Sequence, residues 1–152
     1  MNFYQIITTV YASQWALNQF DLGDANDGQG IFISSWNVPN VTQPTHAEVM
    51  AMETPEMDFQ YAYNAFLTAY LAQLATLIDS VAQQKDFDSA ISCLSYLSST
   101  NGVWRLESET FNAWRDAVWT YLYAQQVLIE NKTRTIPTVE ELNAELPVLV
   151  WP

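Results

Sequence analysis

The stretch from Phe59 to Ile78 carries no charged side chain, and this feature most constrains how the chain can fold. Such a stretch is long enough, as a helix, to cross a lipid bilayer. However, Gln60, Asn64 and Thr68 fall on one helical stripe, as does Thr76, which is the pattern of an amphipathic helix. The chain also starts without a basic segment before an apolar run, so no secretory signal is expected. We therefore expect a soluble, unsecreted protein that makes no use of a membrane.

Three longer helices are expected in the second part of the chain, with apolar residues recurring every three or four positions. The first spans about Pro55 to Gln84, the second about Phe87 to Leu97 and the third about Glu107 to Glu130. The second is expected to bury Ile91, and the third Leu128. Short connections between three such helices indicate a small bundle.

Short motifs mark helix starts. Thr45 followed by Glu48, and Thr138 followed by Glu141, are capping boxes, in which each side chain binds the other residue's backbone N–H. Each predicts a short helix. Thr54 before Pro55 predicts a further start, because threonine is a good N-cap and proline suits the first helical position.

The first part of the chain is richer in turn residues and in short β-like runs. Phe3–Tyr11 and Ile31–Trp36 are rich in β-branched and aromatic residues and are expected to be strands. Asp21–Gly30 is expected to be a loop, and the residues between Ser13 and Phe20 a short helix or an irregular segment. The expected fold is α+β and mainly α, with a strand and loop segment at 1–57 and a helical domain with an apolar tail at 58–152.

Charge is scarce and strongly acidic. Five Lys and Arg residues stand against 17 Asp and Glu residues, which gives a net charge of −12. Binding nucleic acid through its phosphates, or docking on anionic lipid, would need a basic face. Only 14% of residues are charged, against about 25% in ordinary domains, and another 14% are aromatic. Such a chain is expected to be wrapped around a partner or around itself, which covers its apolar surface.

The His, Cys, Asp and Glu residues show no spacing that is typical of a catalytic or metal-binding site. The acidic loop before Gly28 fails the calcium pattern, because with Gly28 at position six the first ligand position falls on Gly23, where an acid is needed. His46 lies within a capping box, and Cys93 lies among apolar helix residues. The acid pairs Asp86/Asp88 and Glu107/Glu109 sit near expected helix starts, where acids complement the helix dipole. The chain is therefore expected to be no enzyme and to hold no cofactor or metal.

The tryptophan-containing helical region and the C-terminal tail are candidates for contact with another chain. Arg115 and Trp119 are four residues apart on a helix, so the guanidinium is expected over the indole. Trp104 and Trp119 are candidate partner-binding residues, since tryptophan is common at interface hot spots. The uncharged tail Leu146–Pro152 either packs on its own domain or joins a partner's surface.

Several motifs together resemble those of bacteriophage tail-fibre assembly and tail-chaperone proteins. They are Ile31–Asn37, then Pro44-Thr45-x-x-Glu48, a Ser/Tyr-rich helix at Ser89–Ser99, Trp104-Arg105-Leu106-Glu107, Trp114-Arg115-Asp116-Ala117-Val118-Trp119 and Pro137-Thr138-Val139-Glu140-Glu141-Leu142. The matches touch most of residues 31–147. Position 108 is serine where the family pattern leads us to expect alanine, and the tail lies beyond the resemblance.

The resemblance implies a non-enzymatic protein that binds a phage tail-fibre protein and assists its trimeric assembly. It would act in the host cytoplasm during assembly, and some such proteins stay on the virion tail. The expected contacts, by strand addition or aromatic anchoring, involve Ile31, Ile33, Trp36, Trp104, Trp119, Val148, Leu149, Val150 and Trp151. The alternative is an acidic inhibitor that mimics nucleic acid and occupies the basic groove of a host enzyme.

Overall fold

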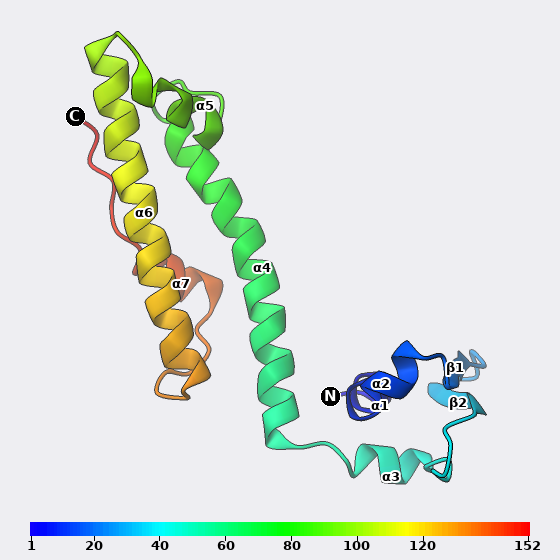
Figure 1. The fold of residues 1–152 in the computed structure, drawn as a ribbon. Helices are drawn as coiled ribbons and strands as arrows, with labels where there is room; N and C mark the ends of the chain where they lie inside the picture. Colours follow the sequence, from blue (N-terminus) through cyan, green and yellow to red (C-terminus); the bar gives the residue numbers. More distant parts are fainter. The chain divides into compact units, whose positions relative to one another are not determined.

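The computed structural model describes residues 1–152 and divides them into two compact units, Met1–Ala62 and Tyr63–Pro152. The fold is α+β and mainly α, as expected: one two-stranded antiparallel sheet lies near the N-terminus, and all the other regular elements are helices (Figure 1). Each unit has its own hydrophobic core.

The first element is a helix, α1 (Phe3–Val10), so the prediction of a strand at Phe3–Tyr11 was wrong. Asn2 and Gln5 form a capping box, in which the Asn2 side chain accepts a hydrogen bond from the Gln5 N–H (3.0 Å) and the Gln5 side chain accepts one from the Asn2 N–H (2.8 Å). Phe3, Ile6 and Ile7 then lie on one helical face and are buried. The local cap and the apolar spacing outweigh the β propensity of the individual residues. A second short helix, α2 (Ala12–Ala16), follows.

The sheet is a hairpin of β1 (Phe20–Asp24) and β2 (Ile31–Trp36). The strand at Ile31–Trp36 is confirmed. The loop predicted at Asp21–Gly30 is wrong for its first four residues, which pair with β2 from Asp21 opposite Ser35 to Asp24 opposite Ile31. Only the following residues form the turn. Strand formation depends on pairing with a distant segment, whereas Asp21 and Gly23 are residue types that are uncommon in strands. The local sequence therefore did not predict β1.

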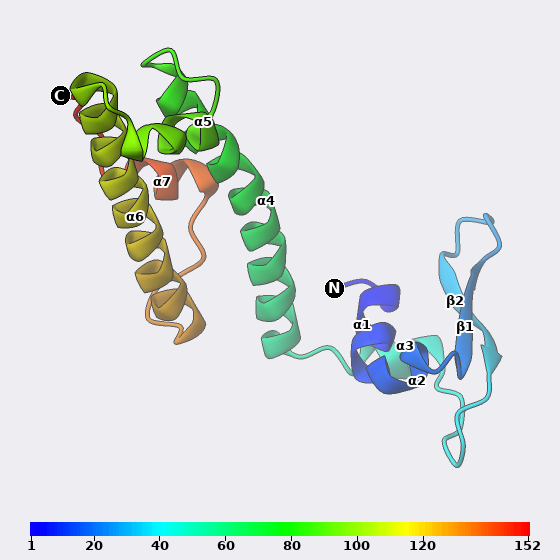
Figure 2. The same cartoon turned by 45° about the horizontal axis from the view of Figure 1, so that its top comes forward.

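The short helix α3 (His46–Met50) begins at the Thr45 capping box, as predicted. The Thr45 hydroxyl accepts from the Glu48 N–H (3.2 Å), and the Glu48 carboxylate accepts from the Thr45 N–H (2.7 Å). The helix packs beside α1 (Figure 2). Val49 is fully buried in the core of residues 1–62, together with Phe3, Ile6, Ile7, Phe20 and Val38.

Helix α4 (Pro55–Gln83) begins at Pro55, as predicted, and the Thr54 hydroxyl accepts from the Met57 N–H (3.2 Å). By length and composition, α4 is the one helix that could cross a membrane, a property it shares with core helices of soluble proteins. Its buried face, which includes Tyr70, Leu74 and Ile78, packs into the core of residues 63–152.

The second predicted helix is shorter than expected and the third is longer. Helix α5 (Ala90–Ser95) begins at Ser89, whose hydroxyl accepts from the Ser92 N–H (3.2 Å), and it passes into the 3₁₀ turn η1 (Tyr96–Ser98). Helix α6 (Gly102–Glu130) starts earlier than predicted, because the Asn101 side chain caps it by accepting from the Val103 N–H (3.0 Å). Glu107 and Glu109 therefore do not begin the helix. Helix α7 (Val139–Ala144) starts at the second capping box, as predicted.

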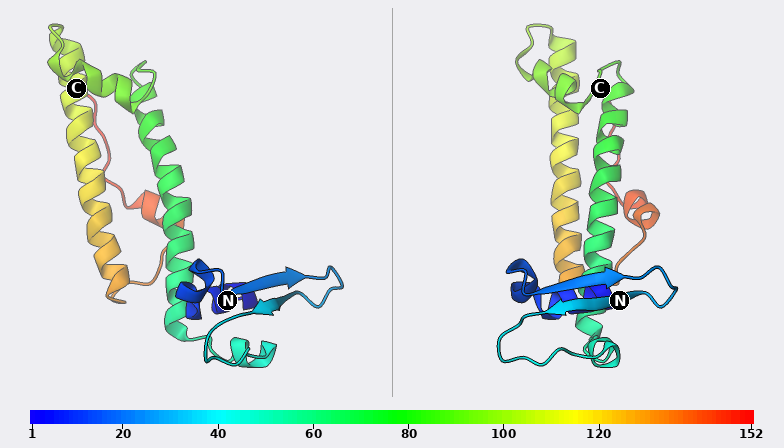
Figure 3. Two further views of the ribbon diagram at one scale, coloured as in Figure 1. Left: turned by 45° about the vertical axis from the view of Figure 1, so that its right-hand side comes forward. Right: turned by 90° about the vertical axis from the view of Figure 1, so that its right-hand side faces the viewer.

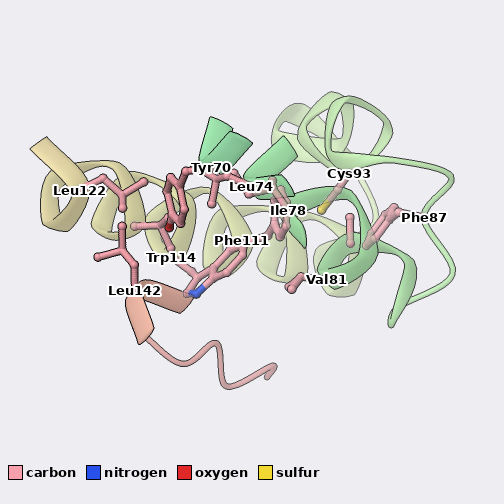
Figure 4. Packing of buried hydrophobic residues seen from close by; sticks show 12 residues of the cluster. Tyr70, Leu74, Ile78, Val81, Phe87, Cys93, Phe111, Trp114, Leu122 and Leu142 are labelled. Carbon is pink, nitrogen blue, oxygen red and sulfur yellow. The ribbon is translucent and has the colours of Figure 1, made fainter. Parts of the chain in front are cut away.

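The core of residues 63–152 lies between α4, α5 and α6 and is closed by α7, which lies beside the α4/α6 pair (Figure 3). Phe111, Trp114, Val118 and Leu122 of α6 are buried, as predicted, and Leu142 of α7 packs with them (Figure 4). The burial predictions for Ile91 and Leu128 were wrong: Ile91 is 81% exposed and Leu128 is 41% exposed. Neighbouring residues take the core positions instead, Cys93 on α5 and Ile129 on α6.

Candidate partner-binding surface

The C-terminal tail, Leu146–Pro152, returns along α6 towards the helix start (Figure 1). The Trp114 indole N–H donates to the Pro147 carbonyl (2.8 Å). The Trp151 ring stacks on Phe111, with a centroid distance of 6.0 Å and an interplanar angle of 6°. Because Phe111 precedes Trp114 on α6 while Trp151 follows Pro147, these two contacts hold the tail antiparallel to the helix.

Side chains alternate along this tail. Leu149 and Trp151 pack against the core of residues 63–152, whereas Val148 is 86% exposed and Val150 is 79% exposed. This is the two-residue period of an extended chain. The backbone groups of Val148, Leu149 and Val150 make no hydrogen bond within the chain. The tail therefore offers an extended, unpaired backbone with two apolar side chains directed away from the core.

A groove of about 290 Å³ lies beside the tail, between α4, α6 and the residues that follow α7. Leu77 and Val81 of α4, with Trp114 and Leu149, supply apolar walls. The Asn143 side-chain oxygen is buried and has no hydrogen-bond partner. A buried acceptor without a donor costs about 1–3 kcal/mol.

The strand residues expected to contact a partner face their own unit. Ile31, Ile33 and Trp36 of β2 pack against the core of residues 1–62, and the Trp36 indole N–H donates to the Val41 carbonyl (2.8 Å). The exposed apolar residue of this strand is Phe32, at 46%, which sequence reasoning missed. The alternation of inward and outward residues along a strand is the signal that points to it. The outer edge of β2 remains unpaired.

The two candidate tryptophans on α6 differ in their surroundings. Trp104 is 49% exposed and lies edge-on to Tyr96, at a centroid distance of 5.6 Å. Trp119 is half-buried beside Tyr123. The expected contact of Arg115 with Trp119 is replaced by a hydrogen bond from the Arg115 guanidinium to the Asn112 side-chain oxygen (3.0 Å). The cation over an indole is instead Lys85, whose Nζ lies 5.8 Å from the Trp151 ring centroid.

Cys93 and His46, the two candidate reactive side chains, both take part in packing contacts. Cys93 is fully buried, and burial raises the pKa of its thiol to about 11, with a smaller contribution from Glu107. His46 is exposed and stacks on the Phe3 ring at 4.6 Å. No group of three or more His, Cys, Asp and Glu side chains is arranged to hold a metal ion.

A polar network links the end of α6 to the end of α7. The Glu145 carboxylate accepts hydrogen bonds from the Tyr121 hydroxyl (2.5 Å) and from the Arg134 guanidinium (2.8 Å). These bonds, with that from Tyr121 the larger effect, lower the pKa of Glu145. The network fixes the chain just before the tail, so the tail begins from a defined position.

Exposed apolar side chains on α6 were also missed by sequence reasoning. Val103, Leu106, Tyr123 and Val127 are each at least half exposed. The helical period predicts the face that is buried most, but apolar residues outside that face are visible only once the core is known.

Comparison with known proteins adds no relative, since no family model, curated protein or solved structure matches this chain.

Proposed function

We propose that this chain is a non-enzymatic chaperone, or a bound accessory subunit, of a phage tail-fibre protein. It binds the fibre chain during trimeric assembly in the host cytoplasm, and it can remain on the virion tail. The motifs that resemble those of fibre-assembly proteins lead to this proposal, and the surface of residues 63–152 supports it.

The observation that carries the proposal is the C-terminal tail. Val148 and Val150 are 86% and 79% exposed, on a backbone that makes no hydrogen bonds of its own. An extended segment of this kind can pair with a strand of another chain through its main-chain groups. An unfinished β-rich fibre has unpaired strand edges, which aggregate unless they are covered.

The tail is held in place before any partner arrives. Trp151 and Leu149 anchor it on α6, and the Pro147 carbonyl is bonded to Trp114. A partner strand would therefore meet a segment that has already lost much of its conformational freedom. Such preorganisation strengthens binding by lowering the entropy cost of association.

The test is co-expression with a phage tail-fibre protein from the same genome as this chain, followed by size-exclusion chromatography. We expect co-elution in a fixed ratio, and we expect Val148→Ser/Val150→Ser to abolish it while far-UV circular dichroism is unchanged. The matched control is Val10→Ser/Val41→Ser, which alters two partly exposed valines of residues 1–62 (42% and 40%).

Three results would count against the proposal or part of it. Absence of any complex with the wild-type chain would contradict the fibre function. Equal binding by the tail variant and the control would place the contact elsewhere. Binding to a nucleic-acid enzyme that weakens steeply with salt would favour the acidic inhibitor, because charge mimicry depends on ionic strength.

A further inference from the structure

A cavity of about 500 Å³ lies away from the tail groove, where α4 ends and α6 begins. Its walls include Lys85, Asp86, Phe87, Tyr96, Trp104 and Glu107. The volume is within the range of small-ligand sites. Neither the core nor the proposed tail contact uses this space.

Three aromatic rings form one side of the cavity. The centroids of Phe87 and Tyr96 are 5.5 Å apart, and the rings are inclined at 54°. Tyr96 and Trp104 are 5.6 Å apart, at 79°. Rings inclined in this way form a corner rather than a flat stack. The faces of aromatic rings attract cations, and tryptophan does so most strongly.

The charged residues of the cavity leave negative charge without a partner. The Lys85 ammonium lies 3.2 Å from one carboxylate oxygen of Glu107 and also over the Trp151 ring. The other oxygen of Glu107 makes no hydrogen bond or ion pair, although the side chain is only 12% exposed. The Asp86 carboxylate also has no partner. One lysine against two carboxylates leaves the lining with a net negative charge.

We propose that this cavity binds an arginine side chain of a partner protein. A guanidinium is planar, so it can lie against an indole or phenol ring while its N–H groups bind a carboxylate. Asp86 and the free oxygen of Glu107 supply such acceptors beside Trp104 and Tyr96. An anionic group would meet the net negative lining, and an uncharged aromatic group would leave Asp86 unpaired.

This inference rests on the proposed function in one respect only, namely that the partner is a protein. The chemistry of the cavity is argued independently of that function. Lys85 is the one like charge that an incoming guanidinium would meet. Replacing it should therefore strengthen binding, which is the opposite of what an anion site would show.

The test uses the full chain and the probe Nα-acetyl-L-arginine amide, followed through the Trp104 indole N–H resonance in ¹⁵N NMR. The matched probe is Nα-acetyl-L-citrulline amide, which has nearly the same shape without the charge. We expect saturable binding of the arginine probe, with a roughly millimolar dissociation constant, as suits a ligand of this size. The citrulline probe should bind at least about 5-fold more weakly, because cation–π and ionic contacts are both lost.

Variants assign the binding to named groups. Asp86→Asn should weaken it about 2- to 5-fold, the range for a partly exposed ion pair. Asparagine tolerates the left-handed backbone of this position (φ 61°), so the fold is retained. Trp104→Ala has no indole at this position, so it is followed through the backbone N–H resonance of Glu107, which also lines the cavity. This variant should weaken binding about 2- to 5-fold, and Lys85→Met should tighten it. The control Asp88→Asn removes the same charge from a neighbouring acid outside the lining. Its dissociation constant for the arginine probe should stay close to that of the wild-type chain, apart from a small effect of the altered net charge.

Equal binding of the arginine and citrulline probes would overturn the proposal. So would an equal response to inorganic phosphate, or an equal loss with Asp86→Asn and Asp88→Asn. These outcomes are separate from those of the fibre co-elution, where the tail valines are altered and the cavity is intact. A chain that binds fibre but not the arginine probe would refute this inference alone.

Discussion

The packing of the tail on α6 predicts different effects for neighbouring tail residues on stability. Trp151 is half-buried, with one ring contact to Phe111 and another to the Lys85 ammonium. Replacing a fully buried tryptophan by alanine costs about 3–5 kcal/mol. Because Trp151 is only partly buried and its indole N–H has no partner, we expect Trp151→Ala to cost about 2 kcal/mol. Val150 is 79% exposed, so Val150→Ala should stay within about 0.5 kcal/mol.

The assay is urea unfolding followed by circular dichroism at 222 nm, where the long helices α4 and α6 dominate the signal. With a slope of about 1–3 kcal/mol per M, a loss of 2 kcal/mol lowers the midpoint by about 1 M. The Val150→Ala midpoint should match that of the wild-type chain within error. Small, equal shifts for both variants would refute the placement of Trp151 against α6. A large effect of Val150→Ala would refute the alternation along the tail.

Three further outcomes follow from individual side chains. Ser108 is fully buried and its hydroxyl has no partner, so Ser108→Ala should raise the free energy of unfolding by about 1 kcal/mol in the same urea assay. Cys93, whose thiol pKa is raised to about 11, should resist alkylation at pH 8 until urea unfolds the chain, as followed by mass spectrometry. The hydrogen bonds from Tyr121 and Arg134 lower the pKa of Glu145 in the folded chain. The contribution of this carboxylate to stability is therefore complete above its unfolded pKa near 4.5, and it is lost as the pH falls through the lower folded pKa. Glu145→Gln should therefore lose less stability between pH 5 and pH 2 than the wild-type chain, as measured by thermal unfolding across that range; equal losses would show that the network does not lower this pKa.

Local signals were reliable where one short segment determines the outcome. Both capping boxes at Thr45 and Thr138 start helices, as predicted, and α4 begins at Pro55. These starts depend on hydrogen bonds within a few residues, so the adjacent sequence contains all the required groups. The capping pair Asn2 and Gln5 carries the same kind of signal, but the β-branched residues that follow it led to the wrong prediction for α1.

The candidate contact surface was only partly predictable. The tail was recognised as apolar and uncharged, yet its division into anchored and exposed residues depends on the surface that α6 presents to it. The inward direction of Ile31 and Ile33, and the exposure of Phe32, likewise depend on which face of β2 meets the core. A strand pattern supplies two faces, and only packing decides which one is buried.

By itself, the sequence determined the mainly helical character of the chain, the starts of α3, α4 and α7, and most of the α6 core face. These properties follow from interactions between residues at most four positions apart. Tertiary structure decided the pairing of β1 with β2, the exposure of Ile91, and the cavity that joins Asp86 to Trp104. The strand pairing and the cavity bring together groups that are distant in the chain, and the exposure of Ile91 depends on which face of α5 meets the core. The contacts that stabilise these features form only when the elements pack against one another.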